Sequence, residues 1–457
     1  MTVLKRIQLF LCLALALPLE CPAQSTDVPV IGAQVFIEPG KTAAEIDNYF
    51  RILHDSGMEI ARIRLFESHM RRAEGEWDYS LYDEAFLSAG KYGIKLFATL
   101  FPEAADGNTD VGGFKIPADA THQGRIGDYI AHVVPHFSDF PAMYTWVLQN
   151  EPGGSGNRNA QTAYLEWIAS EVQKYDRVHY RQVNPHQILD FIPEYDFAAY
   201  RRFLTSLGSS MHPSWHFGRF SRPEYALGVS LMSDIIRSAA LGNPFWITEL
   251  QGGKAYNSGQ VHLCPTGAEI EQWLWTGIAA GAEGIIFWTL NPRMTGIEAG
   301  EWSLLDDDST PSERLEAASR VAAALRENAE LFSEARPCRS GKTLFYDPDR
   351  RIPDSLIVEY RELAAYGVTP EVCAKEDALS APEYAPFHFN EAHEGVLVRT
   401  MVSGDAIITL IINKTGSGLR LRATVPPGSP DVIYGNARVR GRSLLLPEED
   451  CSVIVWK

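Results

Sequence analysis

Cysteine is scarce in this sequence, and the few cysteines show no spacing typical of a metal site. Six cysteines occur in 457 residues, with no CxxC pair and no zinc-like spacing of cysteine and histidine. We therefore expect no zinc site. Four cysteines lie beyond the first 23 residues, and the sequence does not select a disulfide pair among them: Cys264, Cys338, Cys373 and Cys451.

Positive charge is also in short supply. The chain has 41 Lys and Arg against 58 Asp and Glu, which gives a formal net charge of −17. Nucleic acids and anionic membranes are bound mainly through basic surfaces, so we expect no nucleic acid partner. No run of five or six like charges marks an acidic or basic tail.

Long apolar stretches are confined to the N-terminus. Lys5 and Arg6 precede an apolar stretch over 7–17, and Ala23 follows at a position suited to cleavage. This pattern is typical of a signal peptide over 1–23, and it is too short to span a membrane. We expect export to the periplasm or the exterior. Glu20 stands where a lipoprotein has a small residue before its lipidated cysteine, so lipidation at Cys21 is the less favoured alternative.

The rest of the chain has an ordinary globular composition, 45% hydrophobic and 22% charged, and its apolar runs alternate with helical patterns. Eight strand-helix alternations within about 300 residues favour one (β/α)8 TIM barrel over 24–335. The expected strands are 30–37, 60–66, 94–100, 144–149, 187–191, 208–212, 244–248 and 284–290. The expected helices are 42–56, 82–92, 126–136, 164–175, 197–207, 230–241, 268–280 and 311–332.

A different pattern begins after the barrel. Residues 343–346 and 355–366 suggest one strand and one helix within a short α/β segment and linker, 336–394. From 395 to 457, short alternating strands separated by Gly, Asn and Pro predict a small antiparallel β-sandwich.

Two glutamates follow apolar barrel strands directly. Glu151 comes after the fourth strand and precedes Pro152 and two glycines, and Glu249 comes after the seventh. Because catalytic groups of such barrels lie at the C-terminal ends of strands, we expect both carboxylates at one mouth. Two such carboxylates suit glycoside hydrolysis, where one donates a proton and the other attacks the anomeric carbon. A salt bridge at each strand end is the non-catalytic alternative.

These residues resemble the clan A retaining glycosidases, and further motifs resemble glycoside hydrolase family 42, the β-galactosidase-like enzymes. The family-like motifs are GAQVF at 32–36, RIRLF at 62–66, EGEWDY at 74–79, and Phe287-Trp288 followed by GIE at 296–298. The resemblance implies that Glu151 is the acid/base and Glu249 the nucleophile. It implies that Asn150 contacts the sugar 2-hydroxyl and that Glu298 binds the sugar.

The chain also departs from the family pattern. Glu301 stands where the family has histidine, and the tryptophan after the nucleophile is unmatched, with Tyr256 nearby. The cysteine-rich zinc site is missing and the middle domain is shortened, so galactose specificity and a trimer do not follow directly. Four further residues are expected to bind the sugar: Arg64, Trp288, His212 and Tyr256. A buried ion pair for Arg64, core packing for Trp288 and a loop position for His212 are the alternatives.

We therefore expect a retaining exo-β-glycosidase, β-galactosidase-like, that releases terminal β-linked sugars by double displacement. This mechanism requires no cofactor and no metal. The two carboxyl groups of such an enzyme lie about 5–5.5 Å apart. A β-mannosidase, a β-glucosidase, an endo-β-glucanase and a non-catalytic carbohydrate-binding protein remain alternatives. The sequence leaves the sugar, the linkage and the oligomeric state open, including a homo-oligomer.

Overall fold

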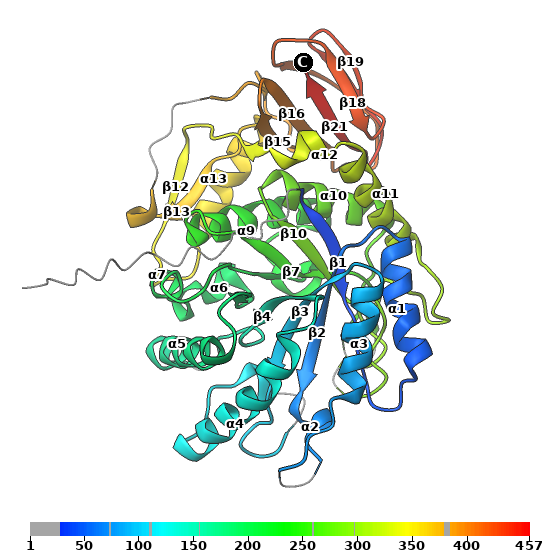
Figure 1. Ribbon diagram of the computed structural model, residues 1–457. Helices are drawn as coiled ribbons and strands as arrows, with labels where there is room; N and C mark the ends of the chain where they lie inside the picture. Colours follow the sequence, from blue (N-terminus) through cyan, green and yellow to red (C-terminus); the bar gives the residue numbers. More distant parts are fainter. Residues whose placement is uncertain are drawn as a thin grey trace, which may run out of the picture.

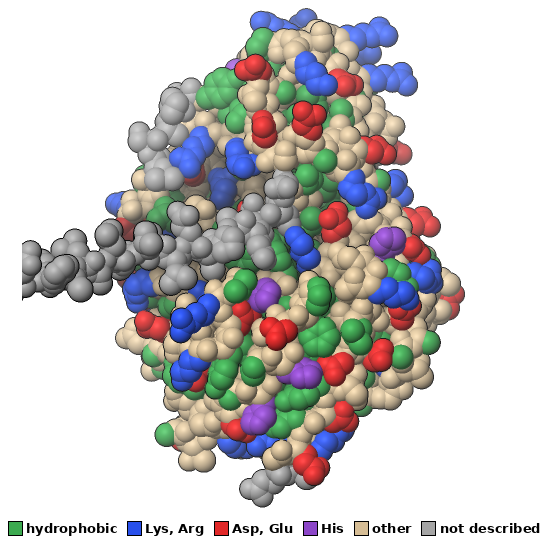
Figure 2. All heavy atoms as spheres, in the orientation of Figure 1, with side chains coloured by type: hydrophobic (Ala, Val, Ile, Leu, Met, Phe, Trp, Pro, Cys, Tyr) green, Lys and Arg blue, Asp and Glu red, His purple; other side chains and the backbone are tan. Residues whose placement is uncertain are grey.

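The computed structural model describes residues 28–72, 75–108, 112–154, 156–257, 260–296, 298–378 and 384–457. The signal peptide predicted over 1–23 lies outside these residues, as do Glu74 and Ile297 of the family-like motifs. None of the described helices is both long and apolar enough to cross a bilayer. Acidic and basic side chains are interspersed over the barrel face in view in Figure 2.

Eight parallel strands form one sheet that curls into a barrel, which confirms the predicted fold (Figure 1). Their order is β5-β4-β3-β2-β1-β10-β7-β6. Gly208 N donates to Val183 O (2.8 Å) and Ser210 N to Pro185 O (3.0 Å), so these bonds close the seam between β5 and β6. The strands are β1 (Val30–Gln34), β2 (Ile60–Phe66), β3 (Lys95–Phe101), β4 (Met143–Val147), β5 (Tyr180–Gln182), β6 (Ser210–Met211), β7 (Trp246–Gln251) and β10 (Gly284–Trp288).

Helices surround this barrel. The long ones are α1 (Ala43–Asp55), α3 (Ser80–Lys91), α4 (Ala120–Phe137), α5 (Arg158–Tyr175), α9 (Tyr225–Ala240), α10 (Gly267–Ala279) and α11 (Glu313–Glu327). The short ones are α2 (Glu67–Met70), α6 (Ile188–Phe191), α7 (Phe197–Tyr200), α8 (Pro213–His216), α12 (Ala329–Ser333) and the 3-10 turns η1 (Gly112–Phe114), η2 (Ile192–Glu194) and η3 (Arg222–Glu224). Thr42 and Glu45 form a reciprocal capping box at the start of α1, as the sequence predicts.

The fifth and sixth units differ from the expectation. Residues 187–191, predicted as a strand, form helix α6 after Gln187, whose φ of 45° turns the chain. The apolar residues of this segment are buried as one helical turn. An apolar run this short does not distinguish a helix from a strand. The true strand β5 is short and polar. The helix predicted over 197–207 is only the short α7, and the long closing helix breaks at Asn328 between α11 and α12.

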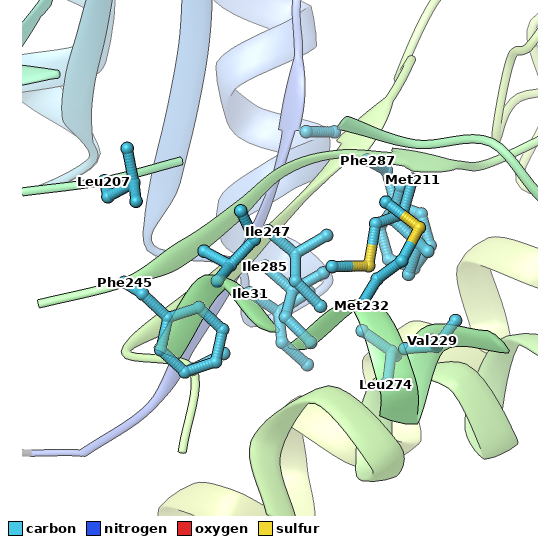
Figure 3. Close-up of a cluster of buried hydrophobic side chains, with 14 of the residues drawn as sticks. Ile31, Leu207, Met211, Val229, Met232, Phe245, Ile247, Leu274, Ile285 and Phe287 are labelled. Carbon is cyan, nitrogen blue, oxygen red and sulfur yellow. The ribbon is translucent and has the colours of Figure 1, made fainter. Parts of the chain in front are cut away.

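The layer between the sheet and its helices fixes the strand that carries Glu249 (Figure 3). Ile247 of β7 and Ile285 of β10 pack with Val229 of α9 and Leu274 of α10 in one buried cluster. Alternate residues of the same strands fill the barrel interior, among them Trp246. The helices therefore hold β7 firmly from outside while its inward residues reach the mouth.

Beyond the barrel, β12 (Thr343–Tyr346), α13 (Asp354–Ala365) and β13 (Glu371–Ala374) form a parallel β-α-β unit that ends in η4 (Lys375–Asp377). Two antiparallel sheets follow, which confirms the predicted sandwich. One is β11-β15-β16-β21-β18 and the other β14-β17-β20-β19. Their bounds are β11 (Arg336–Pro337), β14 (His388–Phe389), β15 (Val396–Ser403), β16 (Ala406–Asn413), β17 (Leu419–Thr424), β18 (Pro430–Tyr434), β19 (Arg438–Arg440), β20 (Ser443–Leu446) and β21 (Cys451–Trp456).

A buried ion pair joins the sandwich to the barrel. Arg399 of β15 binds Asp234 of α9 through two bonds of 2.8 and 3.0 Å, and both side chains are almost completely buried. Tyr360 of α13 donates to the same carboxylate at 2.7 Å. One acidic group thus ties together three parts of the chain. The four described cysteines are free thiols.

Candidate active site

Glu151 and Glu249 lie side by side at the barrel mouth. One carboxylate oxygen from each, together with a ring nitrogen of His212, lies within 4.8 Å of the others. Inverting glycosidases separate their carboxyl groups by about 6.5–9.5 Å, whereas retaining ones hold them about 5–5.5 Å apart. The observed proximity favours the retaining arrangement.

The chain after β4 is bent so that Glu151 faces this site. Leu148 N donates to Gln182 O (2.9 Å), and Asn150 N donates to Gly113 O (2.9 Å). Glu151 itself has φ of 44°, in the left-handed region, which costs about 1–2 kcal/mol for a residue with a Cβ. Its backbone N donates to Asn184 Oδ1 at 3.2 Å, which helps to hold this conformation.

An irregularity in β7 directs Glu249 to the same place. Ile247 pairs with Ile285 of β10, but the next pair is Leu250 with Phe287, so β7 carries one extra residue. A bulge of this kind shifts the alternation of side chains. Leu250 consequently packs in the outer layer while Glu249 faces the polar site, with only 2% of its surface exposed.

Glu249 is held by positive charge and hydrogen-bond donors. Arg62 forms a buried ion pair with its Oε1, and Asn184 Nδ2 donates to that oxygen at 3.2 Å. Arg64 approaches to 4.0 Å. Burial alone would raise the pKa of Glu249, but the charge of Arg62, the hydrogen bond from His212 and the charge of Arg64 outweigh it and lower that pKa below 4.5.

Glu151 has the opposite environment. Burial raises its pKa above the ordinary 4.5, and the negative charge of Glu249 raises it further, while the charge of His212 lowers it only in part. The carboxyl of Glu151 therefore keeps its proton to a higher pH than usual, beside an ionised neighbour. This separation of two pKa values distinguishes an acid from a nucleophile.

His212, one of the predicted ligands, lies between the acids. Its Nε2 is 3.2 Å from Glu249 and 3.9 Å from Glu151. Burial would lower the pKa of His212, but the hydrogen bond to Glu249 and both carboxylate charges raise it. Its neighbour His216 accepts a hydrogen bond from His212 N (3.2 Å), and burial lowers the pKa of His216 well below the usual range.

Asn150 is fully buried and bound on one side only. Arg62 and, at 3.5 Å, Asn184 donate to its Oδ1. Its Nδ2 has no hydrogen-bond partner among the described residues. A buried donor without a partner is costly, and a hydroxyl of a bound ligand would relieve that cost. The site therefore accommodates the predicted contact with a sugar hydroxyl.

Aromatic rings enclose Arg64. Its guanidinium carbon is 4.3 Å from the ring centre of Trp288, 5.0 Å from Phe101 and 5.4 Å from Phe114. Burial lowers the pKa of Arg64 to about 10, so it stays charged at neutral pH. Arg64 and Trp288 thus form one wall of the site, and cation–π contact holds that wall together.

The last two residues predicted to bind the sugar, Glu298 and Tyr256, differ in placement. Glu298 is half-buried, and burial raises its pKa. The positive charges of Arg64 and His212 oppose that rise, so Glu298 lies near these two residues of the site. Tyr256 lies in β8 (Ala255–Asn257), which pairs with β9 (Gln260–Leu263). Ala255 packs in a buried cluster with Trp288, so strand alternation directs the Tyr256 ring away from Trp288. Glu301 accepts a hydrogen bond from Tyr256 N at 2.9 Å and so holds this hairpin.

Several residues of the site were not predicted. Arg62 precedes Arg64 by two positions, and the alternation of a strand was the signal that both face the barrel axis. Asn184 follows the strand that the sequence misplaced, so its role was hidden. Trp302 is buried with φ of 68°, and its ring centre lies 5.0 Å from His212 and 4.9 Å from the half-exposed Trp215.

A cation would find three ligand groups in Glu151, His212 and Glu249. Arg62 and Arg64, however, already place two positive charges against Glu249. Electrostatic repulsion from these arginines opposes a cation there. The arrangement suits proton transfer and nucleophilic attack better than metal binding.

Comparison with known proteins agrees with this geometry. The sequence model of the family Glyco_hydro_42, described as beta-galactosidase, matches residues 178–328. No curated protein sequence matches the chain. The match to the family model confirms the predicted resemblance to glycoside hydrolase family 42 and the predicted class of glycoside hydrolases.

Solved structures share the fold at low sequence identity. A GH42 β-galactosidase from G. stearothermophilus is 11% identical, with a TM-score of 0.73 over 94% of this chain and 99% of that one. A cold-adapted β-galactosidase from Rahnella is also 11% identical, with a TM-score of 0.74 over 94% of this chain and 98% of that one. A GH5_18 protein from Streptomyces cattleya in complex with Manβ1-4GlcNAc is 12% identical, with a TM-score of 0.62 over 77% of this chain and 95% of that one.

Proposed function

We propose that this chain, whose residues 178–328 match the family 42 model, is a retaining exo-β-glycosidase with terminal β-galactosides as its first candidate substrates. One observation carries the proposal: an ionised Glu249 paired with Arg62 lies within 4.8 Å of a Glu151 whose pKa is raised. Such a pair supplies a nucleophile and an acid at one anomeric centre.

In the first step Glu249 attacks the anomeric carbon and Glu151 gives its proton to the leaving oxygen. Formation of the ester removes the negative charge of Glu249. Because that charge helps to raise the pKa of Glu151, the pKa falls once the ester forms. Glu151, then ionised, takes a proton from water, and the water releases the sugar with retained configuration.

Action at chain ends is supported by the closed side of the site. Arg64, Trp288 and Phe101 are almost fully buried and fill the side formed by β2, β3 and β10. Glu249 has little exposed surface. A buried nucleophile against a wall that is closed on this side favours exo over endo action.

A panel of aryl β-glycosides with purified protein tests the proposal, with Glu249→Gln as the matched inactive control. Hydrolysis of the galactoside that is lost in the variant supports it. Absence of hydrolysis for every sugar, with intact folding by circular dichroism, contradicts it and favours a non-catalytic carbohydrate-binding protein.

A β-mannosidase is the second candidate. Glu301, which stands where the family has histidine, holds the β8 backbone, so this part of the pocket differs from the family pattern. The solved structure of the Streptomyces cattleya protein holds a Manβ1-4GlcNAc ligand on a similar fold. The aryl β-mannoside in the same panel decides between the two sugars.

We also propose export to the periplasm or the exterior, on the basis of the basic and apolar N-terminal sequence. Mass spectrometry of the protein from a secreting host tests this. A mature chain that starts at Gln24 supports release, and retention of Met1 overturns the proposal. The mass of the assembled protein by light scattering tests whether it forms a homo-oligomer.

A further inference from the structure

Four arginines form a cationic surface on the C-terminal sandwich. Arg420 and Arg422 lie on β17, and Arg438 and Arg440 lie on β19 of the same sheet. All four are exposed, whereas the residues between them, Leu421 among them, point into the sandwich core. We call this surface the arginine face.

The register of the sheet sets the geometry of the arginine face. β20 lies between β17 and β19, with Leu445 paired to both Arg420 and Arg438. Ser443 is paired in the same way to Arg422 and Arg440. The four Cα atoms thus mark a rectangle of about 7 Å along the strands and about 10 Å across them.

The arginine face has no compensating charge of its own. None of its four arginines forms an ion pair with a described acidic residue. The other outward residues of these strands and of β14 are neutral or weakly basic: Leu445, Ser443, Thr424 and His388. Figure 2 shows blue side chains projecting from the end of the molecule that carries β19 in Figure 1.

Protection of a sheet edge accounts for only part of this arrangement. Charged residues on an edge strand discourage pairing with other chains, which would explain Arg438 and Arg440 on β19. β14 pairs with only Ala423 and Thr424 of β17, so the stretch with Arg420 and Arg422 also has an open side, but edge protection does not require the two arginine pairs to lie opposite each other across β20. Four like charges at this spacing repel one another, and an anionic ligand would turn that repulsion into attraction.

We propose that the arginine face binds an acidic polysaccharide, a polymer with repeated carboxylate or sulfate groups. Guanidinium groups bind such oxyanions bidentately, and Leu445, with 40% of its surface exposed, offers apolar contact for a sugar ring at the centre. A single polymer strand needs only this face. An extended membrane or a nucleic acid duplex also meets the rest of a chain with net charge −17, which repels it.

The arginine face belongs to the sandwich, and the barrel mouth is formed by other strands. Binding there would hold the protein on a polymer while the mouth acts on chain ends nearby. The proposal does not depend on the sugar that the barrel cleaves, because the binding is measured without turnover.

Affinity gel electrophoresis with polygalacturonate, dextran sulfate or neutral dextran in the gel tests the proposal. We expect retardation by one or both acidic polymers and none by dextran. Arg420→Gln/Arg422→Gln, and separately Arg438→Gln/Arg440→Gln, should weaken binding roughly 10- to 30-fold at low salt. Each double variant should also reduce the slope of log affinity against log salt by about 2.

Arg350→Gln/Arg351→Gln is the matched control, since it removes two exposed arginines from another surface. It should bind as the unaltered protein does. An unchanged thermal midpoint and unchanged hydrolysis of a soluble aryl glycoside show that the variants are folded. No retardation by either acidic polymer overturns the proposal, as does full retardation of both arginine-face variants, or binding to phosphatidylserine vesicles without binding to either polymer.

Discussion

Arg62 and Glu249 form an ion pair that is buried from both sides, with 0% and 3% of their side chains exposed. Arg62 also binds Asn150, so one guanidinium positions the nucleophile and the residue next to the acid. Its Nε donates to Thr99 Oγ1 at 3.0 Å, which fixes its orientation. Arg62 therefore fixes the positions of Glu249 and Asn150, although it is not itself predicted to contact the sugar.

Replacement of Arg62 should therefore shift the acid limb of the pH profile. In Arg62→Lys the positive charge is retained but the fork-shaped contact with Glu249 and Asn150 is lost. We expect kcat/KM to fall by about 10- to 100-fold, and the acid limb to move to higher pH because the pKa of Glu249 rises. Arg72→Lys, on an exposed side chain, is the control. An unmoved acid limb would show that Arg62 does not set the charge of Glu249.

The unaltered protein should show a bell-shaped dependence of kcat/KM on pH. Activity requires Glu249 ionised and Glu151 protonated. Because the pKa of Glu249 is lowered, activity is lost only as pH falls well below the usual carboxylate range. Because the pKa of Glu151 is raised, activity is lost as pH rises through that higher value. Initial rates at low substrate concentration across the pH range give both limbs.

Glu151→Gln should abolish the alkaline limb. The amide cannot donate a proton, so hydrolysis of glycosides with poor leaving groups should fall by about 10²–10⁴-fold. Formation of the glycosyl-enzyme from a dinitrophenyl glycoside, which needs no acid, should fall far less and can be followed as a burst of phenolate. An alkaline limb that survives in Glu151→Gln would assign the acid to another group.

Trp215 should contribute to binding on the leaving-group side. It has 48% of its surface exposed and packs edge-to-face on Trp302, beside His212. We expect Trp215→Ala to lower kcat/KM for a disaccharide roughly 3- to 10-fold, through loss of stacking, and to leave inhibition by the free monosaccharide unchanged. Tyr175→Ala removes a comparably exposed ring elsewhere and should change neither. Equal losses for both ligands would place Trp215 at the cleaved sugar instead.

The ion pair between Arg399 and Asp234 should matter for stability rather than for chemistry. Arg399→Met removes the bidentate partner of the buried Asp234, which keeps only Arg237, at 3.1 Å, and Tyr360, so we expect a loss of up to about 3–5 kcal/mol of unfolding free energy. Thermal unfolding should show a lower midpoint, and Asp234→Leu in the same chain should recover part of it. The kcat on an aryl glycoside at 20 °C should stay unchanged. A thermal midpoint equal to that of the unaltered protein would contradict a stabilising role for this ion pair.

The sequence predicted the parts of the site that follow long apolar strands. Glu151 and Glu249 were found because a run of buried residues leads directly into each carboxylate. Arg64 was recognised at the end of a strand, yet Arg62, two residues earlier, proved to be the partner of Glu249. Strand alternation places both arginines on the barrel axis, but only the structure shows which of them Glu249 reaches.

Short and irregular elements were not accessible in this way. Strand β5 has three residues, Tyr180, Arg181 and Gln182, with no apolar run to reveal it. The extra residue in β7 and the hairpin of β8 and β9 depend on register with neighbouring strands. The alternation of arginine with apolar residues at 419–424 and 438–440 is visible in the sequence. Only the pairing of both strands with β20 brings the four arginines together on one surface.

The most direct measurement of the central claim is to trap the sugar on the enzyme. A 2-deoxy-2-fluoro glycoside with an activated leaving group slows the second step, so the glycosyl ester accumulates and a proteolytic digest locates it by mass spectrometry. We predict one added sugar on the peptide that contains Glu249, and none in Glu249→Gln. An adduct on another residue, or turnover that releases the inverted anomer without an adduct, would contradict the account.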